Sequence, residues 1–459
     1  MLSNHKSYAK IALTITIFLT MLLLAISCKE CPTEPDYDIY LAVEDVACVW
    51  VTLKVTLPDS GKINRFELDR NDSTVAAYTC YDNDTLITDE GLIPDKDYSY
   101  TVRFLKDSKT KAESEPVTVH TMPTTSHNFV WEIDTLGNYG SYLNDVWIID
   151  ENDIWVVGYL RVDDPDSSFD GTGQETFNAA RWDGEKWNLM RMERGAPMES
   201  IWYFNENDIW ATGGVPIHWD GEEWTFYHFW DMGILDEDDG GVNQIWASSP
   251  INIYFVGRFG SIVHYNGSTF RKIESGTGVK LRDISGSSDG EHVFVTGYDN
   301  AGELSGQSVA LELVGESCRI LYQGNSYSGD LMNGDYGRFQ AVEVFNETAY
   351  FSTGGTWLVK YNFSNKITQI EGKYSHFNEG YCMATSAGNS AIDMFLVCCW
   401  GPIFHYNGAS WNIDMQITDQ FPLGILVPHS IRISGDVVAI AYELGGWEYA
   451  LVARGYRNS

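Results

Sequence analysis

The C-terminal part of the chain is built from a sequence repeat, which restricts its fold more than any other feature. The segment Asn152–Gly158 has close copies at Asn207–Gly213 and Ile251–Gly257, and weaker copies at Glu291–Gly297 and Glu347–Thr353. The copies share a central aromatic residue, and these residues are 40 to 56 positions apart: Trp155, Trp210, Tyr254, Phe294 and Tyr350. This spacing is typical of the blades of a β-propeller.

Each copy also has the same neighbours along the sequence. A short strand pattern such as Asp145–Trp147 precedes it. A hairpin signal follows, in which Asp-Gly or Asn-Gly separates two aromatic segments, at Arg181–Trp187, His218–Trp224, His264–Phe270 and His405–Trp411. Asp, Asn and Gly tolerate the positive φ angles of tight hairpin turns. One repeat therefore predicts four antiparallel strands, named A to D in chain order.

The number of repeats predicts seven blades and a way to close their ring. Repeats begin near Asn144, Glu199, Val242, Leu281, Phe339, Tyr381 and Ser430. The last repeat is one strand short, whereas Phe129–Asp134, before the first repeat, matches the D-strand pattern of Trp187–Met190. We predict that Phe129–Asp134 completes the last blade, which would remove an exposed sheet edge.

The region before the propeller predicts a separate β-sandwich. Strand patterns without helical periodicity occur at Cys48–Leu57, Asn64–Arg70, Val75–Tyr81, Tyr98–Leu105 and Pro116–Thr121. The segment Gly91–Val102 resembles the fibronectin type III signature, and Trp50 lies on the expected early strand. The predicted fold class is all-β: a fibronectin III-like sandwich over 37–123 and a seven-bladed propeller over 127–459. The resemblance implies a spacer role for the sandwich.

The N-terminus predicts export and lipid anchoring. Lys6 and Lys10 precede the apolar run Ile11–Ile26, and Ser27 lies directly before Cys28. The run is shorter than the roughly 20 residues that a transmembrane helix needs, so a signal peptide is favoured. We predict a signal peptide over 1–27, a lipidated Cys28 and a tether over 28–36. The expected location is the cell envelope, at the outer membrane or the cell surface.

Charge and cysteine content restrict the partners. The chain has 30 basic and 64 acidic residues, a net charge of -34, which disfavours nucleic acid. Its eight cysteines form no zinc pattern. In an exported protein Cys48 and Cys80 are candidates for a disulfide, whereas the adjacent Cys398 and Cys399 are interpreted as buried thiols. The expected partners are an envelope protein or a glycan, and the membrane through the lipid anchor.

Over about 330 residues the repeats resemble bacterial propellers of the neuraminidase-repeat and photosystem-assembly-factor groups. The Asp-Gly-x-x-Trp hairpins are similar to a shortened Asp-box, which lacks the serine and one spacer residue of the full motif. An Asp-box stabilises a hairpin, so this similarity implies no sialidase chemistry. The resemblance to assembly factors favours a scaffold for envelope proteins.

Strand phase predicts where a ligand would bind. In a propeller the A–B and C–D turns lie on one side, here called the short-turn face. The B–C and D–A connections lie on the other, here called the long-connection face. The longer segments are all of the second kind: 160–177, 299–307, 230–241, 325–338, 373–380 and 416–428. Ligand sites are frequent where variable loops gather on a rigid scaffold.

The long connections combine carboxylates with aromatic side chains. The candidate ligand-binding residues are Asp163, Asp164, Asp166, Phe169, Trp230, Asp236, Asp238, Asp239, Tyr327, Tyr336 and Trp447. Aromatic rings stack on sugars and carboxylates accept hydrogen bonds from their hydroxyl groups, so a glycan ligand is one interpretation. Carboxylates also suit Ca²⁺, although no EF-hand spacing is present. Solvated acidic loops without a ligand are the alternative.

Catalysis is the weaker interpretation of the sequence. A glycoside hydrolase needs two carboxylates about 5 to 9 Å apart, and no pair is singled out. Sialidase-like chemistry needs arginines near the axis, and the candidates by position alone are Arg161, Arg258, Arg282, Arg338 and Arg432. The tryptophans of strands A and B and the histidines at 218, 264 and 405 are interpreted as structural. We therefore predict a non-catalytic binding protein, with a glycoside hydrolase or sialidase-like enzyme as the alternative.

Overall fold

The structure is a computed structural model. It describes residues 38–57, 64–80, 82–106, 108–164, 173–192, 196–300, 305–325, 336–354, 357–371, 383–399, 401–421, 425–445 and 449–458. The chain divides into two compact units, Met1–Pro123 and Thr124–Ser459, which are treated separately below. The predicted signal peptide, Cys28 and tether lie outside the described residues. Within the described ranges, no helix has the length and apolar character needed to cross a bilayer.

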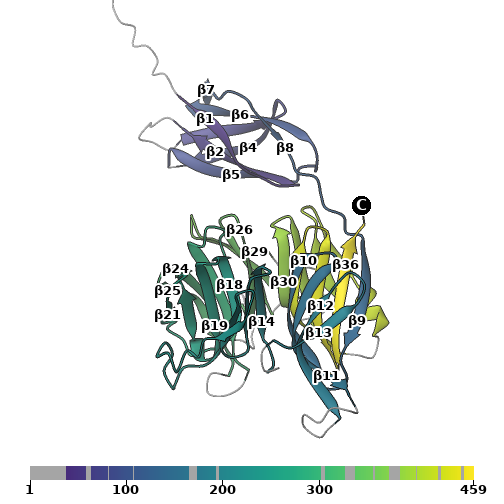
Figure 1. Cartoon of the computed structure of the whole chain (residues 1–459). Helices are drawn as coiled ribbons and strands as arrows, with labels where there is room; N and C mark the ends of the chain where they lie inside the picture. The colour runs from purple at the N-terminus through teal and green to yellow at the C-terminus, as the bar shows by residue number, and fades with distance from the viewer. Residues whose placement is uncertain are drawn as a thin grey trace, which may run out of the picture. The chain divides into compact units, whose positions relative to one another are not determined.

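The N-terminal unit is a sandwich of two antiparallel sheets (Figure 1). One sheet contains β1 (Tyr40–Val46), β2 (Trp50–Thr56) and β5 (Asp84–Glu90). The other contains β3 (Asn64–Arg70), β4 (Ser73–Cys80), β6 (Asp97–Lys106), β7 (Lys109–Glu113) and β8 (Val117–His120). In this second sheet the order is β4-β3-β6-β7, and β8 also pairs with β6.

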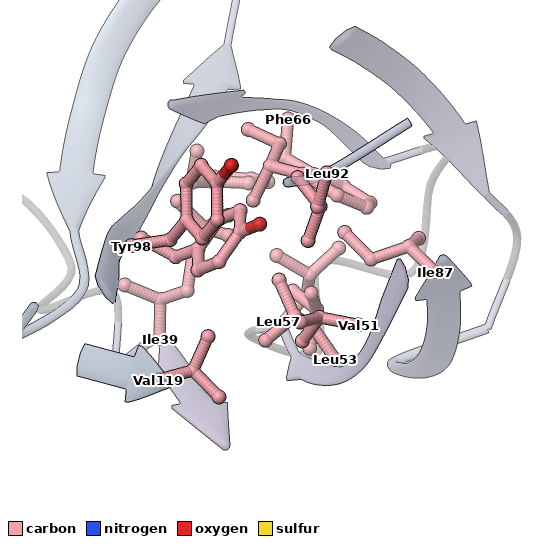
Figure 2. Packing of buried hydrophobic residues seen from close by; sticks show 14 residues of the cluster. Ile39, Val51, Leu53, Leu57, Phe66, Ile87, Leu92, Tyr98 and Val119 are labelled. Carbon is pink, nitrogen blue, oxygen red and sulfur yellow. The ribbon is translucent and has the colours of Figure 1, made fainter. Parts of the chain in front are cut away.

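Alternating side chains of the two sheets form the sandwich core. Val51, Leu53 and Val55 point inward from β2, and every second residue of β6 from Tyr98 is buried. Figure 2 shows these side chains meeting between the strands, with Phe66 and Leu92 beside them. This period of two is what a sheet with one buried face requires.

The thiol of Cys48 lies in the sandwich with its Sγ 3.2 Å from the carbonyl oxygen of Pro123. The side chain of Cys80 lies outside the described residues, so the Cys48–Cys80 disulfide remains a prediction. In the propeller, Cys398 is buried and Cys399 is half-buried.

The described residues of the C-terminal unit form seven four-stranded antiparallel sheets, which confirms the predicted seven-bladed propeller. Blade 1 contains β10 (Tyr142–Asp150), β11 (Asp153–Asp163), β12 (Gln174–Trp182) and β13 (Trp187–Met190). Blade 2 contains β14 (Ser200–Asn205), β15 (Asp208–Thr212), β16 (Pro216–Trp219) and β17 (Trp224–Phe226). Blade 3 contains β18 (Val242–Ser249), β19 (Asn252–Gly257), β20 (Ile262–Tyr265) and β21 (Phe270–Lys272), with the short 3-10 helix η1 (Arg258–Gly260) between β19 and β20.

The remaining blades follow the same order. Blade 4 contains β22 (Leu281–Gly286), β23 (His292–Tyr298), β24 (Gln307–Val314) and β25 (Ser317–Asn325). Blade 5 contains β26 (Phe339–Phe345), β27 (Thr348–Thr353), β28 (Trp357–Asn362) and β29 (Ile367–Glu371). Blade 6 contains β30 (Met383–Ser390), β31 (Asp393–Cys398), β32 (Ile403–Tyr406) and β33 (Trp411–Asp414), and the helix α2 (Gln416–Gln420) follows it. Blade 7 contains β34 (Leu426–Ser434), β35 (Val437–Leu444), β36 (Tyr449–Arg457) and β9 (Phe129–Leu136).

The ring is closed by the strand that precedes blade 1, as predicted. β9 pairs antiparallel with β36, with Trp131 opposite Gly455 and Leu136 opposite Ala450 (Figure 1). The indole Nε1 of Trp131 donates to Asp414 Oδ2 of blade 6 at 2.8 Å. The closing strand therefore joins blade 7 by its backbone and blade 6 by a side chain.

A recurring contact inside the blades explains the repeated histidines. In blade 2, His218 Nε2 lies 2.8 Å from Asp208 Oδ1, at the start of strand B, and its ring stacks on Trp210 at 4.2 Å. His264 in blade 3 and His405 in blade 6 make equivalent contacts with the first residue and the aromatic residue of their own strand B. These histidines hold strand C against strand B.

In each predicted C–D hairpin of blades 1, 2, 3 and 6, one Asp or Asn side chain stabilises the turn. In blade 1, Asp183 Oδ1 accepts hydrogen bonds from the backbone N–H groups of Glu185 and Lys186 at 3.0 and 2.9 Å. Gly184 between them has a φ of 89°, a conformation that favours glycine. Asp220, Asn266 and Asn407 make the corresponding bonds in blades 2, 3 and 6.

Candidate functional site

The residues predicted to bind a ligand are distributed over several connections. Asp163 ends β11 and accepts from Gln174 Nε2 at 3.2 Å, while the backbone N–H of Asp164 donates to the carbonyl of Gly173 at 2.9 Å. These bonds hold the two ends of the B–C connection of blade 1 together. Four further residues that were predicted to bind a ligand lie outside the described residues: Asp166, Phe169, Tyr327 and Trp447.

The connection between blades 2 and 3 contains four more of the predicted residues. Trp230 is 37% exposed. Asp239 accepts from the backbone N–H of Asp236 through Oδ2 at 2.7 Å, and its Oδ1 pairs with Lys272 Nζ at 2.9 Å. Asp239 thus stabilises its own loop, whereas Asp236 and Asp238 are exposed.

Tyr336 is half-buried and packs against aromatic neighbours. Its ring contacts Tyr322 at 5.3 Å and Phe339 at 6.0 Å, between blades 4 and 5. Among the described residues, the predicted ligand-binding side chains belong to three separate connections, and no contact joins one connection to another. Their roles remain predictions.

The axis of the propeller carries charged and aromatic side chains that the sequence analysis did not connect. The first strands of neighbouring blades contact one another around the ring. Arg432 on β34 lies over the rings of Trp147 on β10 and Trp202 on β14, with its Cζ atom 5.0 and 5.5 Å from their centroids. Trp147 and Trp202 are half-buried here, unlike the buried strand-B tryptophans Trp155 and Trp210.

Two acidic residues face the same axis from blades 4 and 5. Desolvation raises the pKa of Asp283 on β22 to about 7. Desolvation and the nearby Asp283 raise the pKa of Glu343 on β26 to about 8. The positive charge of Arg432 lowers the pKa of both groups, but this effect is smaller than the increase caused by desolvation.

The opening of the axis on the long-connection face is basic on one side. The guanidinium of Arg282 lies 4.0 Å from the ring centroid of Tyr298, and that of Arg338 lies 5.3 Å from it. Arg282 Nε also donates to the carbonyl oxygen of Tyr298 at 2.9 Å. Burial and the neighbouring Arg282 and Arg258 lower the pKa of Lys280, which places these cations close together. We call Arg258, Lys280, Arg282 and Arg338 the basic cluster.

An exposed aromatic residue lies next to the basic cluster. Phe259, which follows Arg258 in the B–C connection of blade 3, is 65% exposed and has a φ of 54°. A bulky residue rarely adopts this left-handed conformation, and such strain is frequent at binding sites. The turn is held because the backbone N–H of Arg258 donates to the carbonyl of Gly241 at 2.9 Å, and Ser261 N to the carbonyl of Arg258 at 3.1 Å.

The opposite side of the opening carries tyrosines and acidic groups. Tyr142 and Tyr159 face each other with ring centroids 5.8 Å apart. Burial and the proximity of Glu199, Tyr159 and Glu443 raise the pKa of the Tyr142 hydroxyl. Glu443 in turn lies 3.2 Å from His429 Nε2.

Three members of the basic cluster differ from many other cations of the propeller in their pairing. Arg258, Lys280 and Arg282 form no ion pair within the ranges that the structure describes. In contrast, these propeller arginines each have an acidic partner: Arg181, Arg191, Arg271, Arg319, Arg454 and Arg457. In a chain with 64 acidic residues, unpaired cations on one face are available to an external anion.

Sequence analysis found part of this site and missed part. It selected Arg258, Arg282 and Arg338 by their positions near the axis, and the structure brings them together. It missed Lys280, which precedes β22 as Arg338 precedes β26; this shared register was the available signal. It also missed Phe259, because the sequence gives no sign of its exposure.

Carboxylates of the long connections are the kind of ligand that Ca²⁺ would need. No group of three or more His, Cys, Asp or Glu side chains among the described residues has an arrangement suited to a metal ion. In the 227–241 connection, the hydrogen bond and the ion pair of Asp239 occupy both of its carboxylate oxygens.

Comparison with known proteins identifies the fold. No family model and no curated protein matches the sequence. The chain is similar to the structure described as YCF48 bound to D1 peptide, with a TM-score of 0.51 and 14% identity over 73% of this chain and 97% of that chain. This likeness supports the propeller fold.

Two further structures are more distant. YCF48 from Cyanidioschyzon merolae has a TM-score of 0.47 and 13% identity, over 71% of this chain and 98% of that chain. PorZ, a bacterial surface component of the type-IX secretion system of Porphyromonas gingivalis, has a TM-score of 0.41 and 11% identity, over 67% of this chain and 36% of that chain. Both similarities are too low to support an argument about function.

Proposed function

We propose that this chain is a non-catalytic envelope lipoprotein whose propeller binds a protein ligand through the long-connection face. The observation that carries the proposal is the basic cluster, whose members Arg258, Lys280 and Arg282 have no internal ion pair within the described ranges. The chain has a net charge of -34, so acidic side chains that could pair with these cations are plentiful. The peptide named in the description of the YCF48 structure is compatible with this role.

The chemistry of the cluster favours a ligand that carries carboxylates. A guanidinium binds a carboxylate through two parallel N–H donors, and Arg282 is already oriented by Tyr298. Phe259 adds an exposed ring beside these donors. Aromatic residues and arginines dominate the binding energy of many protein interfaces. The ligand class is therefore an acidic peptide segment of an envelope protein.

Binding to an array of acidic peptides tests this proposal. The full mature chain is applied to peptides rich in Asp and Glu and to matched peptides with Asn, Gln and an amidated C-terminus. Arg282→Gln combined with Lys280→Gln is expected to weaken binding to the acidic peptides at least about tenfold, with a smaller dependence on salt. The matched control is Arg271→Gln, an exposed arginine that pairs with Glu316 on the outer side of blade 3. Equal binding by wild type and the double variant would refute the proposal.

A carboxylated sugar is the second candidate, because the gathering of three arginines and Tyr298 also fits its carboxylate. In this alternative the chain is a glycoside hydrolase or a sialidase-like enzyme. Incubation with sialylated and uronate-containing glycans separates the two functions. Released reducing sugar that disappears in Arg282→Gln supports the enzyme, whereas its absence together with peptide binding supports the non-catalytic protein.

We also propose the anchoring and the spacer role. Cys28 is the lipidation site that ends the signal peptide, and the sandwich is a fibronectin III-like spacer. The backbone N–H of Ile93 donates to the hydroxyl of Tyr98 at 2.9 Å, a link of the kind found in sandwiches of this class. Cys28→Ser should move the chain from the membrane fraction to the soluble fraction, and unchanged fractionation would refute the anchor.

A further inference from the structure

A pair of exposed tyrosines lies on the long-connection face where blade 7 meets blade 1. Tyr139 is 63% exposed in the connection between β9 and β10, and Tyr449 is 39% exposed at the start of β36. Their ring centroids are 6.5 Å apart and the rings are at 85°. One ring thus contacts the other edge-on, and large parts of both remain open to solvent.

The turn that presents Tyr139 is fixed to blade 1. The backbone N–H of Asn138 donates to the carbonyl of Arg161 at 2.6 Å, and Arg161 N donates to Ser141 Oγ at 2.9 Å. Gly137 and Gly140 have φ angles of 72° and 88°. A Cβ atom on Gly137 would lie 2.4 Å from Ser141 Oγ, so this turn requires glycine. A rigid turn that exposes an aromatic ring loses little entropy when a ligand binds.

A guanidinium with free donors lies beside this turn. The Nη1 atom of Arg161 would be 3.2 Å from a Cβ on Gly140, so the side chain lies against the turn. Its buried Nε has no hydrogen-bond partner. The side chain of Arg161 also forms no ion pair within the described ranges. The Nε atom is enclosed, so the Nη atoms of this half-buried side chain are the donors that a ligand oxygen can reach.

We propose that Tyr139, Tyr449 and Arg161 form a binding site for a neutral sugar ring. The apolar C–H face of a sugar stacks on a tyrosine ring, while the Tyr hydroxyls and the Arg161 N–H groups bind its oxygens. A sugar fits better than a protein surface because, among the described residues of this site, the exposed rings are those of two tyrosines. A neutral sugar fits better than an anionic one because two of the three side chains are tyrosines, whose hydroxyls hydrogen-bond sugar hydroxyls and carry no positive charge. This site is independent of the basic cluster, since different residues form it.

Retention on neutral polysaccharides tests the proposal. The full mature chain is passed over immobilised starch, β-1,3-glucan, mannan and xylan, and saturation-transfer NMR is recorded with oligosaccharides of the retained polymer. Tyr139→Ala should weaken binding at least about tenfold, whereas Tyr139→Phe should retain most of it. Tyr40→Ala is the matched control, because Tyr40 on the sandwich is also 63% exposed. Thermal melts of all variants report whether each is folded.

Three outcomes would overturn the proposal. In the first, the wild-type chain is retained on none of the polysaccharides. In the second, Tyr139→Ala and Tyr40→Ala bind the polysaccharides equally. In the third, Tyr139→Ala loses acidic-peptide binding and the wild-type chain gives no sugar signal. The third outcome would make the tyrosine pair part of the protein-binding surface. Peptide binding is measured separately, so failure of the sugar site and failure of the proposed protein ligand can be distinguished.

Discussion

The short-turn face and the surroundings of the propeller axis use charge in different ways. On the short-turn face, cations pair with acidic partners: Arg457 Nη2 lies 2.6 Å from Asp393 Oδ2, and the half-buried Arg181 pairs with both Asp153 and Glu206. Along the axis and on the long-connection face, Arg258, Lys280, Arg282, Asp283 and Glu343 form no ion pair within the described part of the chain.

Paired charges stabilise the ring of blades, whereas unpaired charges are explained better by ligand binding than by folding. A buried charge without a partner costs stability, so its retention needs a reason outside folding. Removing a paired charge should therefore destabilise the propeller. Neutralising an unpaired one should leave stability unchanged or increase it. The predictions below test this contrast in order of expected effect.

Loss of the closing contact is the largest change. A chain that ends at Asp419 lacks β34 to β36, so β9 has no strand to pair with and blade 6 loses its neighbour. We expect the cooperative thermal transition of the propeller to disappear in calorimetry. A sharp melt at the wild-type temperature would contradict closure as the basis of cooperativity.

Removal of Asp393 should cost about 3 to 5 kcal/mol, because Arg457 loses its buried partner and keeps only the exposed Asp436. Asp393 accepts from Arg457 Nη2 at 2.6 Å, His405 Nε2 at 2.8 Å and Asn389 Nδ2 at 2.7 Å. Burial alone would raise its pKa, but these bonds lower the pKa to about 2. Urea unfolding of Asp393→Ala measures the loss.

The control for this variant uses the same arginine. Asp436 pairs with Arg457 Nε at 3.0 Å, but its side chain is 78% exposed. Exposed ion pairs contribute little, so Asp436→Ala should cost less than about 1 kcal/mol. Equal losses in the two variants would show that burial of the pair does not decide its contribution.

The fold could be read from the sequence wherever a pattern repeats. The seven blades, the A-to-D order and the closing strand followed from the aromatic anchors and the Asp-Gly and Asn-Gly turns. In the sandwich, three strands were missed: β1, β5 and β7. β5 reads Asp-Thr-Leu-Ile-Thr-Asp-Glu, and only Ile87 in it is fully buried, so its alternation is too weak to detect.

The site was harder to predict because it depends on which strands surround the axis. Position along the sequence identified three arginines of the basic cluster. The contact of Arg432 with Trp147 and Trp202 joins three blades and has no local signal. The composition of the acidic loops predicted a ligand site, yet Asp239 forms an ion pair with Lys272 of the same chain. Composition cannot show which carboxylates already have partners.

Neutralising an unpaired axial acid should stabilise the propeller at high pH. The pKa of Glu343 is raised to about 8, so the folded state holds its proton more strongly than the unfolded state. Stability is therefore lost as pH rises from about 4.5 to 8. Glu343→Gln should be about 1 to 2 kcal/mol more stable than wild type at pH 9, after allowance for the partial exposure of Glu343, and nearly equal at pH 5.

The control is Glu347→Gln, an exposed residue in the A–B turn of the same blade. Urea unfolding at both pH values should show a pH-dependent gain for Glu343→Gln alone. If Glu343→Gln were less stable than wild type at pH 9, the Glu343 carboxylate would have a favourable partner. Glu343 would then no longer count among the unpaired charges.

The smallest effect concerns a histidine pair on the short-turn face. His127 Nδ1 lies 2.9 Å from His405 Nδ1, and His127 Nε2 lies 3.2 Å from Ser410 Oγ. Because His405 Nε2 donates to Asp393, its Nδ1 must accept, so His127 is the donor between the rings. Burial, His405 and Arg457 lower the pKa of His127 to about 4, which outweighs the opposite effect of Asp393.

The unfolded chain therefore binds more protons than the folded chain between about pH 4 and 6.5. The contribution of neutral His127 is complete above pH 6.5 and is lost as pH falls towards 4. His127→Gln keeps a donor but does not titrate. Its stability relative to wild type should rise by about 1 kcal/mol between pH 7.5 and 4.5, after allowance for partial exposure. If the stability difference between His127→Gln and wild type were the same at pH 7.5 and 4.5, protonation of His127 would not weaken the histidine pair. The contacts of this face would then not depend on neutral histidines.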